Sequence, residues 1–252
     1  MMIELQHTAL IYQTPEGEVE AVRDVSFGLA EGEFVSLVGP SGCGKSTLLS
    51  AVAGLLPLSA GEIRLDGRTV SNPGREIGLM PQQDQLFEWL SIWDNVTLGL
   101  RLRRMDTPEK RAYVQGLLER YGLAEFADKR PSQLSGGMRQ RCALIRTLAA
   151  EPKVLLLDEP FSALDYQTRL RVSEDIYQII RQQHKTALLV THDISEAIRM
   201  SDRIVVLSHR PAVVRNIYDL GELRSLSPAQ RRDAPSYHCY FDSIWKELDG
   251  HG

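Results

Sequence analysis

Apolar and polar positions alternate in short runs through the first part of the chain. Turns rich in Gly, Pro, Asn and Asp separate these runs, which predicts strands at 3–12, 22–30, 32–39, 61–67 and 75–82. One segment among them, 45–55, has no helix breaker before Gly54 and predicts a helix. The beginning of the chain is therefore expected to be mainly β structure.

The apolar spacing becomes helical after the fifth of these runs and returns to strand–helix alternation from Lys153. The middle region predicts helices at 92–104, 107–123 and 135–150, and Thr107 before Pro108 marks one helix start. Beyond it, strands are expected at 154–158, 186–191 and 203–208, with helices at 166–183 and 193–200. Strands as apolar as "VLLLD" and "TALLV" suit a sheet that is covered on both faces.

These patterns predict an α/β fold with a mixed sheet and an antiparallel β part at the N-terminus. A helical subdomain at about 88–150 is expected as an insert in a core that spans 1–215. The remaining 216–252 form a short tail that ends in an amphipathic helix, "YHCYFDSIWKEL". This tail is too short for a second domain, so we expect it to pack on the core and to add no small-molecule sensor.

Composition narrows the class of protein. The 252 residues are 43% hydrophobic and 25% charged, which is ordinary for a soluble globular protein, and the net charge of −4 argues against a nucleic-acid partner. Cys43, Cys142 and Cys239 lack paired or metal-like spacing, which indicates a reducing compartment. Neither a signal peptide nor an apolar run of membrane-spanning length is visible. Any membrane part must therefore belong to another chain.

A phosphate-binding motif follows the apolar run 34–38. The segment "GPSGCGKST" fits G-x-x-x-x-G-K-[ST] between a predicted strand and a predicted helix, which is the context that the motif needs. Backbone N–H groups of such a loop wrap a phosphate, Lys45 reaches the β- and γ-phosphates, and the Ser46 hydroxyl binds Mg²⁺. A glycine turn that only starts a helix would not need the lysine and the hydroxyl. The expected ATP-binding residues here are Gly39, Pro40, Ser41, Gly42, Cys43, Gly44, Lys45, Ser46 and Thr47.

Two acids and a histidine follow other apolar strands. Asp158 ends "VLLLD", where P-loop NTPases place the acid that holds Mg²⁺, and Glu159 comes next, suited to orient the attacking water. The alternation of side chains along a strand aims these two carboxylates in different directions. His192 ends "LLVTH"; a lone histidine is usually structural, but ligands collect at this edge of a nucleotide-binding sheet.

These segments, in this order, resemble the nucleotide-binding subunit of ATP-binding-cassette (ABC) transporters over roughly residues 2–210. "GPSGCGKST" resembles Walker A, "VLLLDEP" Walker B, "LSGGMRQR" the ABC signature, "SALD" the D-loop and His192 the switch histidine. "MPQQDQLFEW" resembles the Q-loop, with Gln82 at the family glutamine and neighbouring Gln83 as the alternative. Met138 and Pro81 depart from common family residues. Met138 leaves the serine and glycines of the signature intact, and Pro81 precedes Gln82 in the Q-loop, where an aromatic residue is common.

The resemblance implies a head-to-tail dimer with two equivalent ATP sites. ATP would lie on Walker A of one subunit, with Tyr12 against adenine, and Mg²⁺ would be held by Ser46, Gln82 and Asp158. Glu159 and His192 would be catalytic, on the water and the γ-phosphate respectively. The second subunit would contribute Ser135, Gly136, Gly137 and Asp165. The partner could be a second copy or another cassette subunit.

The resemblance further implies the energy-coupling ATPase of a transporter at the cytoplasmic face of a bacterial membrane. A separate permease would dock near Gln82–Val96, and a secreted solute-binding protein would act indirectly. "PFSALDYQTR" and "DRIVVLSHRP" are similar to the nitrate/sulfonate/taurine importer branch, whose members carry small anions or vitamin precursors. The alternatives are an exporter or lipoprotein-release cassette, a non-transport ABC ATPase, and a scaffold that binds nucleotide without hydrolysis. The last is disfavoured because every catalytic position is filled.

Overall fold

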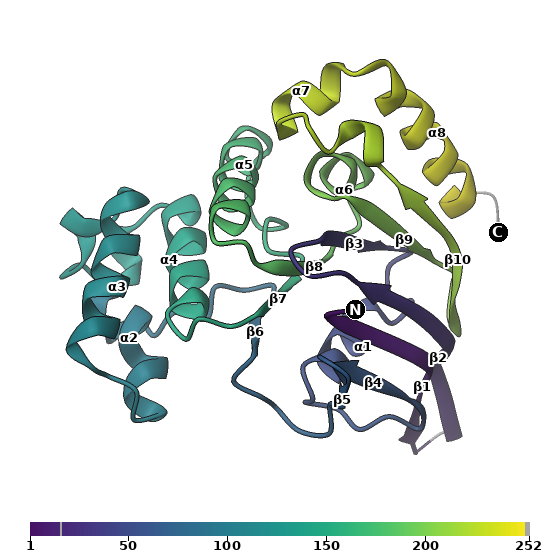
Figure 1. The fold of residues 1–252 in the computed structure, drawn as a ribbon, viewed down its shortest axis with the longest axis horizontal. Coiled ribbons are helices and arrows are strands. Elements are labelled where there is room, and N and C mark those ends of the chain that lie inside the picture. The colour runs from purple at the N-terminus through teal and green to yellow at the C-terminus, as the bar shows by residue number, and fades with distance from the viewer. Residues whose placement is uncertain (16, 250–252) are drawn as a thin grey trace.

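The computed structural model describes residues 1–15 and 17–249. Within these residues the strands form one sheet in the order β5-β4-β1-β2-β10-β9-β3-β8-β7-β6 (Figure 1). The strands are β1 (Ile3–Thr14), β2 (Gly17–Leu29), β3 (Phe34–Val38), β4 (Ala60–Leu65), β5 (Arg68–Thr69), β6 (Ile77–Met80), β7 (Val154–Asp158), β8 (Thr186–Val190), β9 (Arg203–Leu207) and β10 (Ala212–Asp219).

The helices fall into three groups along the chain. They are α1 (Lys45–Val52); then α2 (Ile92–Leu102), α3 (Pro108–Arg120) and α4 (Gly136–Leu148); then α5 (Tyr166–Gln182), α6 (Ile194–Met200), α7 (Pro228–Asp233) and α8 (Pro235–Asp249). Short 3₁₀ helices lie at Ala124–Phe126, Pro131–Gln133 and Gly221–Leu223. No helix in 1–15 and 17–249 is both long and apolar enough to cross a membrane.

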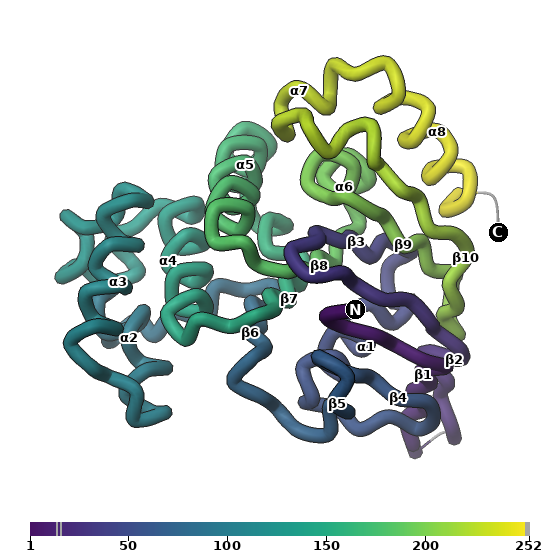
Figure 2. The backbone as a smooth tube through the Cα atoms, in the orientation of Figure 1, coloured from purple at the N-terminus to yellow at the C-terminus, as the bar shows by residue number. Residues whose placement is uncertain are grey.

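The sheet has a parallel part and an antiparallel part. Strands β6, β7, β8, β3 and β9 run parallel to one another, whereas β1 pairs antiparallel with β2 and β4. The tube in Figure 2 shows the N-terminal strands beside the parallel core. The predicted mixed sheet with an N-terminal antiparallel part is confirmed.

Helices cover the parallel strands on both faces. Successive side chains of a strand point to opposite faces, so Leu155 and Leu157 pack in the cluster that contains α4 and α5. Leu156 points the other way and packs with Leu48 and Leu49 of α1. This double burial explains why "VLLLD" lacks polar alternation.

The helices α2, α3 and α4 lie together at one side of the sheet (Figure 1). Helix α4 packs against α2, α3, α5 and β6, and therefore connects this group to the core. Thr107 caps α3 as expected, because its side chain accepts a hydrogen bond from the Lys110 amide at 3.3 Å. The helices expected between 88 and 150 are present, each ending within a few residues of its predicted boundary.

The sequence reading missed strand β10. The expected boundary between 215 and 216 falls inside this strand, which pairs antiparallel with β9 and parallel with β2. Strand β10 thus joins the antiparallel part of the sheet to the parallel core. Most of its side chains are at least partly exposed, so its "AVVRNIYD" gives no continuous apolar run. The tail proper begins after Asp219, and α8 packs on α6 and β9.

Candidate active site

The phosphate motif forms a tight loop between β3 and α1. Gly44 precedes the first residue of α1 with φ 114°, a conformation open to glycine, and a Cβ there would lie 3.0 Å from the Ala21 carbonyl oxygen. At Gly39 a Cβ would lie 2.9 Å from the Cys43 sulfur. These two glycines are therefore required by the backbone and by close packing. The loop leads directly into the N-terminus of α1, where backbone N–H groups favour an anion.

Lys45 and Ser46 occupy different positions on this loop. The Lys45 ammonium donates to the carbonyl oxygens of Gly39 (2.7 Å) and Pro40 (2.9 Å), and its side chain is buried. The Ser46 hydroxyl donates to Oδ1 of Asp158 at 2.9 Å. Residues 112 positions apart in the sequence thus form one cluster. A lysine ammonium beside a hydroxyl and a carboxylate suits a metal-bound phosphate.

The electrostatics of Asp158 depend on several opposing effects. Burial raises the pKa of this carboxyl, and the charge of Glu159 adds to the rise. The hydrogen bond from Ser46 and the charge of Lys45 lower the same pKa. A cation at this position would offset the burial, because it favours the ionised carboxylate. Hydroxyl and carboxylate oxygens are the hard ligands that Mg²⁺ prefers, so the donor set fits this ion.

Glu159 leaves the strand that Asp158 ends. Its backbone has φ 42°, in the left-handed region, and its N–H donates to the Val190 carbonyl oxygen at 2.8 Å. This turn carries the side chain to His192, where Glu159 Oε2 lies 3.1 Å from Nδ1. The divergence of the two carboxylates therefore comes from this turn rather than from strand alternation alone. Left-handed backbone at a non-glycine residue is strained and is often found at functional sites.

Thr191 and Glu196, which the sequence analysis did not single out, hold the segment 191–196 that contains His192. The Thr191 hydroxyl donates to Glu196 Oε2 at 2.6 Å, and the Asp193 N–H donates to the Thr191 hydroxyl at 3.0 Å. Burial raises the pKa of Glu196 to about 7. The spacing of Thr191 and Glu196, five residues apart across a helix start, was the available signal. Both side chains hold the segment that carries His192.

Gln82 lies in the same region of the fold, beyond β6. Its side-chain amide donates to the Ser162 hydroxyl at 3.2 Å, and that hydroxyl donates to the Glu159 carbonyl oxygen at 3.0 Å. Ser162 thus connects Gln82 to the acid segment and was not among the expected site residues. This contact favours Gln82 over Gln83 as the glutamine of the site.

Tyr12 lies on the β1–β2 hairpin and is 37% exposed. It is paired with Val19 in the sheet register, two residues before Ala21, whose carbonyl contacts the phosphate loop at Gly44. Tyr12 therefore lies on the hairpin whose second strand borders the loop at Ala21. None of the contacts between described residues joins it to the loop directly.

The segment Ser135–Gly137 stands apart from this cluster. Ser135 caps α4, accepting a hydrogen bond from the Met138 amide at 3.3 Å. A Cβ on Gly137 would lie 2.7 Å from Cγ2 of Val172, and one on Gly136 would lie 3.1 Å from Leu164. Gly137 therefore allows the close contact of α4 with α5, and Gly136 lies against the Leu164 side chain. No hydrogen bond or salt bridge between described residues joins them to Gly39–Thr47.

Asp165 also serves a local purpose within the chain. It caps α5, accepting a hydrogen bond from the Thr168 amide at 3.1 Å. Hydrogen bonds from Thr168 lower the pKa of this carboxyl, which is fully exposed. Asp165 is exposed and follows Leu164, which lies against Gly136.

The comparisons with known proteins agree with this geometry. A family model described as "ABC transporter" matches residues 22–162, more than half of the chain. An uncharacterized ABC transporter ATP-binding protein, YtlC of Bacillus subtilis, is 46% identical, covering 98% of this chain and 95% of its own. The chain belongs to the ABC transporter family.

Two further relatives of this ABC cassette have names that state a transport role. The taurine import ATP-binding protein TauB of Rhizobium johnstonii is 43% identical, covering 93% of this chain and 89% of its own. The nitrate transport protein NasD of Klebsiella oxytoca is 39% identical, and the match covers 94% of this chain and 92% of NasD.

The solved structures extend the comparison to oligomeric state and chemistry. The dimeric cassette MJ0796 has a TM-score of 0.75 and 34% identity, covering 87% of this chain and 99% of its own. The same cassette in a post-hydrolysis state with ADP and Pi has a TM-score of 0.74 and 32% identity, with the same coverage. The chain is thus an ABC ATPase with the P-loop NTPase fold, as the motifs predicted.

Proposed function

We propose that this chain is the ATP-hydrolysing, energy-coupling subunit of a bacterial ABC importer for a small anion or vitamin-precursor-like solute. The names of TauB and NasD, which concern taurine import and nitrate transport, support this substrate class. An exporter or lipoprotein-release cassette is the second candidate, since such cassettes share the motifs. The chain would work peripherally, at the cytoplasmic face of the membrane.

In this proposal one copy binds the phosphates of ATP through Gly39–Thr47. Lys45 would neutralise the β- and γ-phosphates, and Ser46, Asp158 and Gln82 would hold Mg²⁺. The ion, when bound, supplies positive charge against the phosphate oxygens. Catalysis would then be mainly positioning and electrostatic stabilisation.

Glu159 would accept a proton from the attacking water or orient it toward the γ-phosphate. His192 lies 3.1 Å from this carboxylate and would contact the γ-phosphate, where negative charge is redistributed in the transition state. The left-handed turn at Glu159 and the Thr191–Glu196 bond would hold these two groups in place. Both catalytic groups therefore come from the ends of neighbouring core strands, β7 and β8.

The site would be completed by a second copy of the chain. Ser135, Gly136 and Gly137 would approach the γ-phosphate of the partner's ATP, with Asp165 nearby. A two-fold arrangement makes two equivalent sites from one self-complementary interface. The dimeric MJ0796 structure supports this assembly. Ser135 is exposed and its hydroxyl bonds within its own helix, so a second molecule would have access to it.

A permease would dock at Gln82–Val96. Phe87 and Trp89 are 37% and 70% exposed, with ring centroids 5.0 Å apart, and they form an aromatic surface on this segment. Aromatic residues are enriched where proteins bind one another. The loop is held in shape by Asn95, whose side chain exchanges hydrogen bonds with Phe87 at 2.7 and 3.1 Å.

The same segment is tied to the helix that follows the signature. Arg139 Nε donates to Asp84 at 3.0 Å, and Arg146 donates to the carbonyl oxygens of Asp84 and Gln85 at 2.7 and 2.6 Å. Movement of α4 on ATP closure would therefore be transmitted to the docking segment. This connection is the observation that carries the coupling proposal.

The experiment is reconstitution with the membrane protein that co-purifies with this chain. The pair, purified together and placed in proteoliposomes with the solute-binding protein, is expected to take up labelled taurine or nitrate when ATP is supplied. A Phe87→Ala/Trp89→Ala double variant is expected to lose co-purification, whereas Leu102→Ala, another exposed apolar residue, should keep it. ATP-driven export without a binding protein would contradict the importer role. Co-purification unchanged in the double variant would contradict the docking site.

A further inference from the structure

One arginine of α5 bridges two segments at the active-site edge of the sheet. The Arg169 side chain donates from Nη2 to the Leu164 carbonyl oxygen at 3.0 Å, and its Nη1 lies 3.6 Å from Oδ2 of Asp193. Leu164 belongs to the segment "SALD" before α5, whereas Asp193 caps the start of α6. A guanidinium carries several N–H groups in a fixed plane, so it can hold a carbonyl oxygen and a carboxylate at the same time.

Each end of this bridge lies next to a group of the proposed site. The Leu164 side chain lies against the signature, since a Cβ on Gly136 would be 3.1 Å from Cδ2 of Leu164. Asp193 directly follows His192, one of the two proposed catalytic residues. Arg169 therefore connects the signature contact to the segment that contains His192, within a single chain.

Asp193 is firmly held in that segment. Its Oδ1 accepts a hydrogen bond from the Glu196 amide at 3.1 Å, and its own amide donates to the Thr191 hydroxyl at 3.0 Å. The two carboxylate oxygens thus have separate partners, because Oδ2 faces Arg169. A displacement of Asp193 would also displace His192, since hydrogen bonds on both sides of Asp193 hold the backbone of 191–196.

A second arginine ties α6 to α5 independently of this bridge. Arg199 of α6 is 7% exposed, and its Nη2 donates to the Ser173 hydroxyl of α5 at 3.0 Å. The side chains of Arg169 and Asp193 are 27% and 31% exposed, and partly exposed ion pairs contribute little to stability. Loss of the bridge should therefore leave the two helices packed and change mainly the positions of the segments that it joins.

We propose that Arg169 is a positioning residue that couples the two ATP sites of the dimer, by linking Leu164 at the signature to the segment of His192. The proposal rests on the dimer of the proposed function. In that dimer Gly136 of one chain approaches the ATP of the partner, whereas His192 of the same chain approaches its own ATP. Hydrogen-bond and ion-pair networks of this kind can carry coupling between sites. Closure at one site would thereby change the position of a catalytic group at the other.

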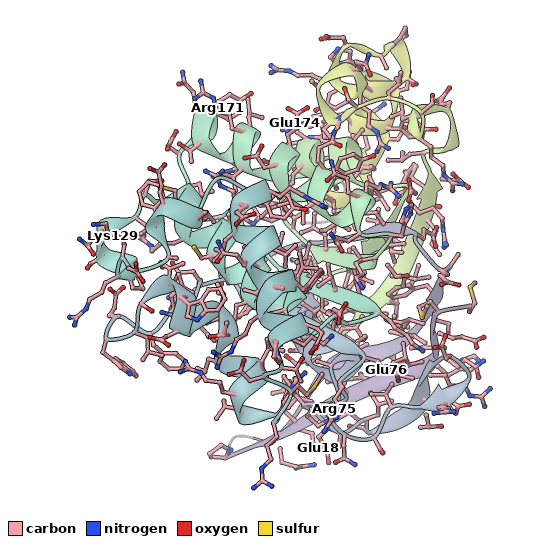
Figure 3. All side chains as sticks on the ribbon, turned by 60° about the vertical axis from the view of Figure 1, so that its left-hand side comes forward. Glu18, Arg75, Glu76, Lys129, Arg171 and Glu174 are labelled. Carbon is pink, nitrogen blue, oxygen red and sulfur yellow. The ribbon has the colours of Figure 1, made fainter. Side chains whose placement is uncertain are left out.

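Steady-state ATP hydrolysis by Arg169→Ala is the first measurement. We expect kcat to fall roughly tenfold and KM for ATP to change less than about twofold, since a displacement of about 1 Å can cost about 100-fold in rate. Arg171→Ala is the matched control, because Arg171 also lies on α5 and extends from the outer surface in Figure 3. Both variants should unfold at nearly the same temperature. An unchanged kcat, or a loss confined to KM, would overturn the proposal.

A cycle with Asp193 tests whether the bridge itself is responsible. Asp193→Ser removes the carboxylate that faces Arg169 but keeps an oxygen that can cap α6. Both single variants break the same contact, so the double variant should be clearly faster than the product of the two separate losses. Losses that multiply would contradict the bridge.

The conservative variant Arg169→Lys separates the bridge from the charge alone. It should remain slow, because different guanidinium nitrogens contact Leu164 and Asp193, and lysine has a single side-chain nitrogen. Full recovery of kcat in Arg169→Lys would contradict a bridge that needs both contacts.

Mixed dimers separate coupling from the support of one histidine. When Glu159→Gln and Ser135→Arg chains are mixed, the one working site binds ATP on the Ser135→Arg copy and receives its signature from the Glu159→Gln copy. With Arg169→Ala added to one copy at a time, hydrolysis is expected to fall in both arrangements. A fall only when the change is in the ATP-binding copy would show that Arg169 serves its own His192 alone, and would overturn the coupling.

The parent mixture, without Arg169→Ala, distinguishes the two levels of the proposal. Recovery of hydrolysis in this mixture is expected from the shared site of the proposed function. Its absence would contradict the shared site and the coupling together, whereas the outcomes that concern Arg169 contradict the coupling alone.

Discussion

The phosphate-loop region and the signature region differ in how much of their chemistry is satisfied within one chain. Around the loop, a hydrogen bond from Ser46 to Asp158 joins segments that are far apart in the sequence, and Lys45 is held by carbonyl oxygens of the loop itself. In the signature region, the one hydrogen bond between the Ser135 side chain and another described residue comes from the Met138 amide of its own helix. One region is an assembled cluster, whereas the other is a helix start exposed on a separate group of helices.

This difference indicates how the active site is divided. A cluster whose members already orient one another can bind phosphate in a single chain, because its geometry does not depend on a partner. In the proposed assembly, the helix start at Ser135, which has only local bonds, would meet the phosphate of another molecule. A cassette similar to this chain, MJ0796, is dimeric, and a two-fold dimer would bring the two regions of different copies together at two equivalent sites.

The largest effect is expected in the phosphate-loop region. Glu159→Gln should retain ATP binding but lower steady-state ATP hydrolysis by about 100-fold or more, since positioned acid–base groups contribute roughly 10²–10⁴-fold. Phosphate release and equilibrium ATP binding on the purified variant check this. Glu174→Gln, outside the site, serves as the control. Retention of most of the hydrolysis rate would remove Glu159 from its role.

A substitution in the signature region should cause a similar loss of hydrolysis, but for a different physical reason. Ser135→Arg is expected to reduce hydrolysis about 100-fold, as for the loss of a preorganised donor, while ATP affinity of the monomer stays nearly unchanged. Ser227→Arg is the matched control, because Ser227 also caps a helix, α7. A large loss of monomer affinity in Ser135→Arg would argue that the signature acts within one chain.

Glu196, in the segment 191–196 that contains His192, should make the unfolding free energy of the protein depend on pH. The folded-state pKa of Glu196, about 7, lies above its ordinary value, so its stabilising contribution is complete at low pH and is lost as pH rises through 7. Desolvation is the main cause of this raised pKa, and the charge of Asp193 raises it further. The hydrogen bond from Thr191 and the charges of Arg169 and Arg199 lower it.

The corresponding measurement compares the wild type with Glu196→Gln. From pH 5.5 to 8.5 the wild type should lose about 2 kcal/mol of unfolding free energy relative to the variant. Denaturant unfolding at both pH values gives the two differences. An unchanged difference would show that Glu196 is ionised throughout this range.

The smallest effect concerns packing at the signature. Gly137→Ala should lower the unfolding free energy by about 1–3 kcal/mol, because its Cβ would meet Val172 at 2.7 Å. In a Val172→Ala background the same change should cost less, and thermal unfolding of the four variants measures that coupling. If the cost is equal in both backgrounds, the glycine is not required by this contact.

Motifs and periodicity were sufficient for the core and for the phosphate loop. The predicted strand at 154–158 and the helix from Lys45 are present, because a doubly covered sheet requires continuous apolar strands and the loop motif requires a following helix. Sequence spacing also located Thr107 as a helix cap. These features depend on neighbours in the chain, which a sequence displays directly.

Contacts between distant segments were beyond the same reasoning. Strand β10 is identified by its pairing with β9 and β2, since its own residues are mixed in polarity. Ser162 reaches Gln82 across 80 positions, which no local pattern indicates. The left-handed backbone of Glu159 likewise depends on its bond to Val190 in the neighbouring strand.

Mixing two inactive variants tests most directly whether the active site is shared between copies. In a mixed dimer of Glu159→Gln and Ser135→Arg, one site carries both changes and the other carries neither. Random mixing of equal amounts should therefore restore hydrolysis to roughly a quarter of the wild-type rate, given one intact site in half of the dimers. Hydrolysis no greater than the average of the two separate variants would contradict a site built from two copies.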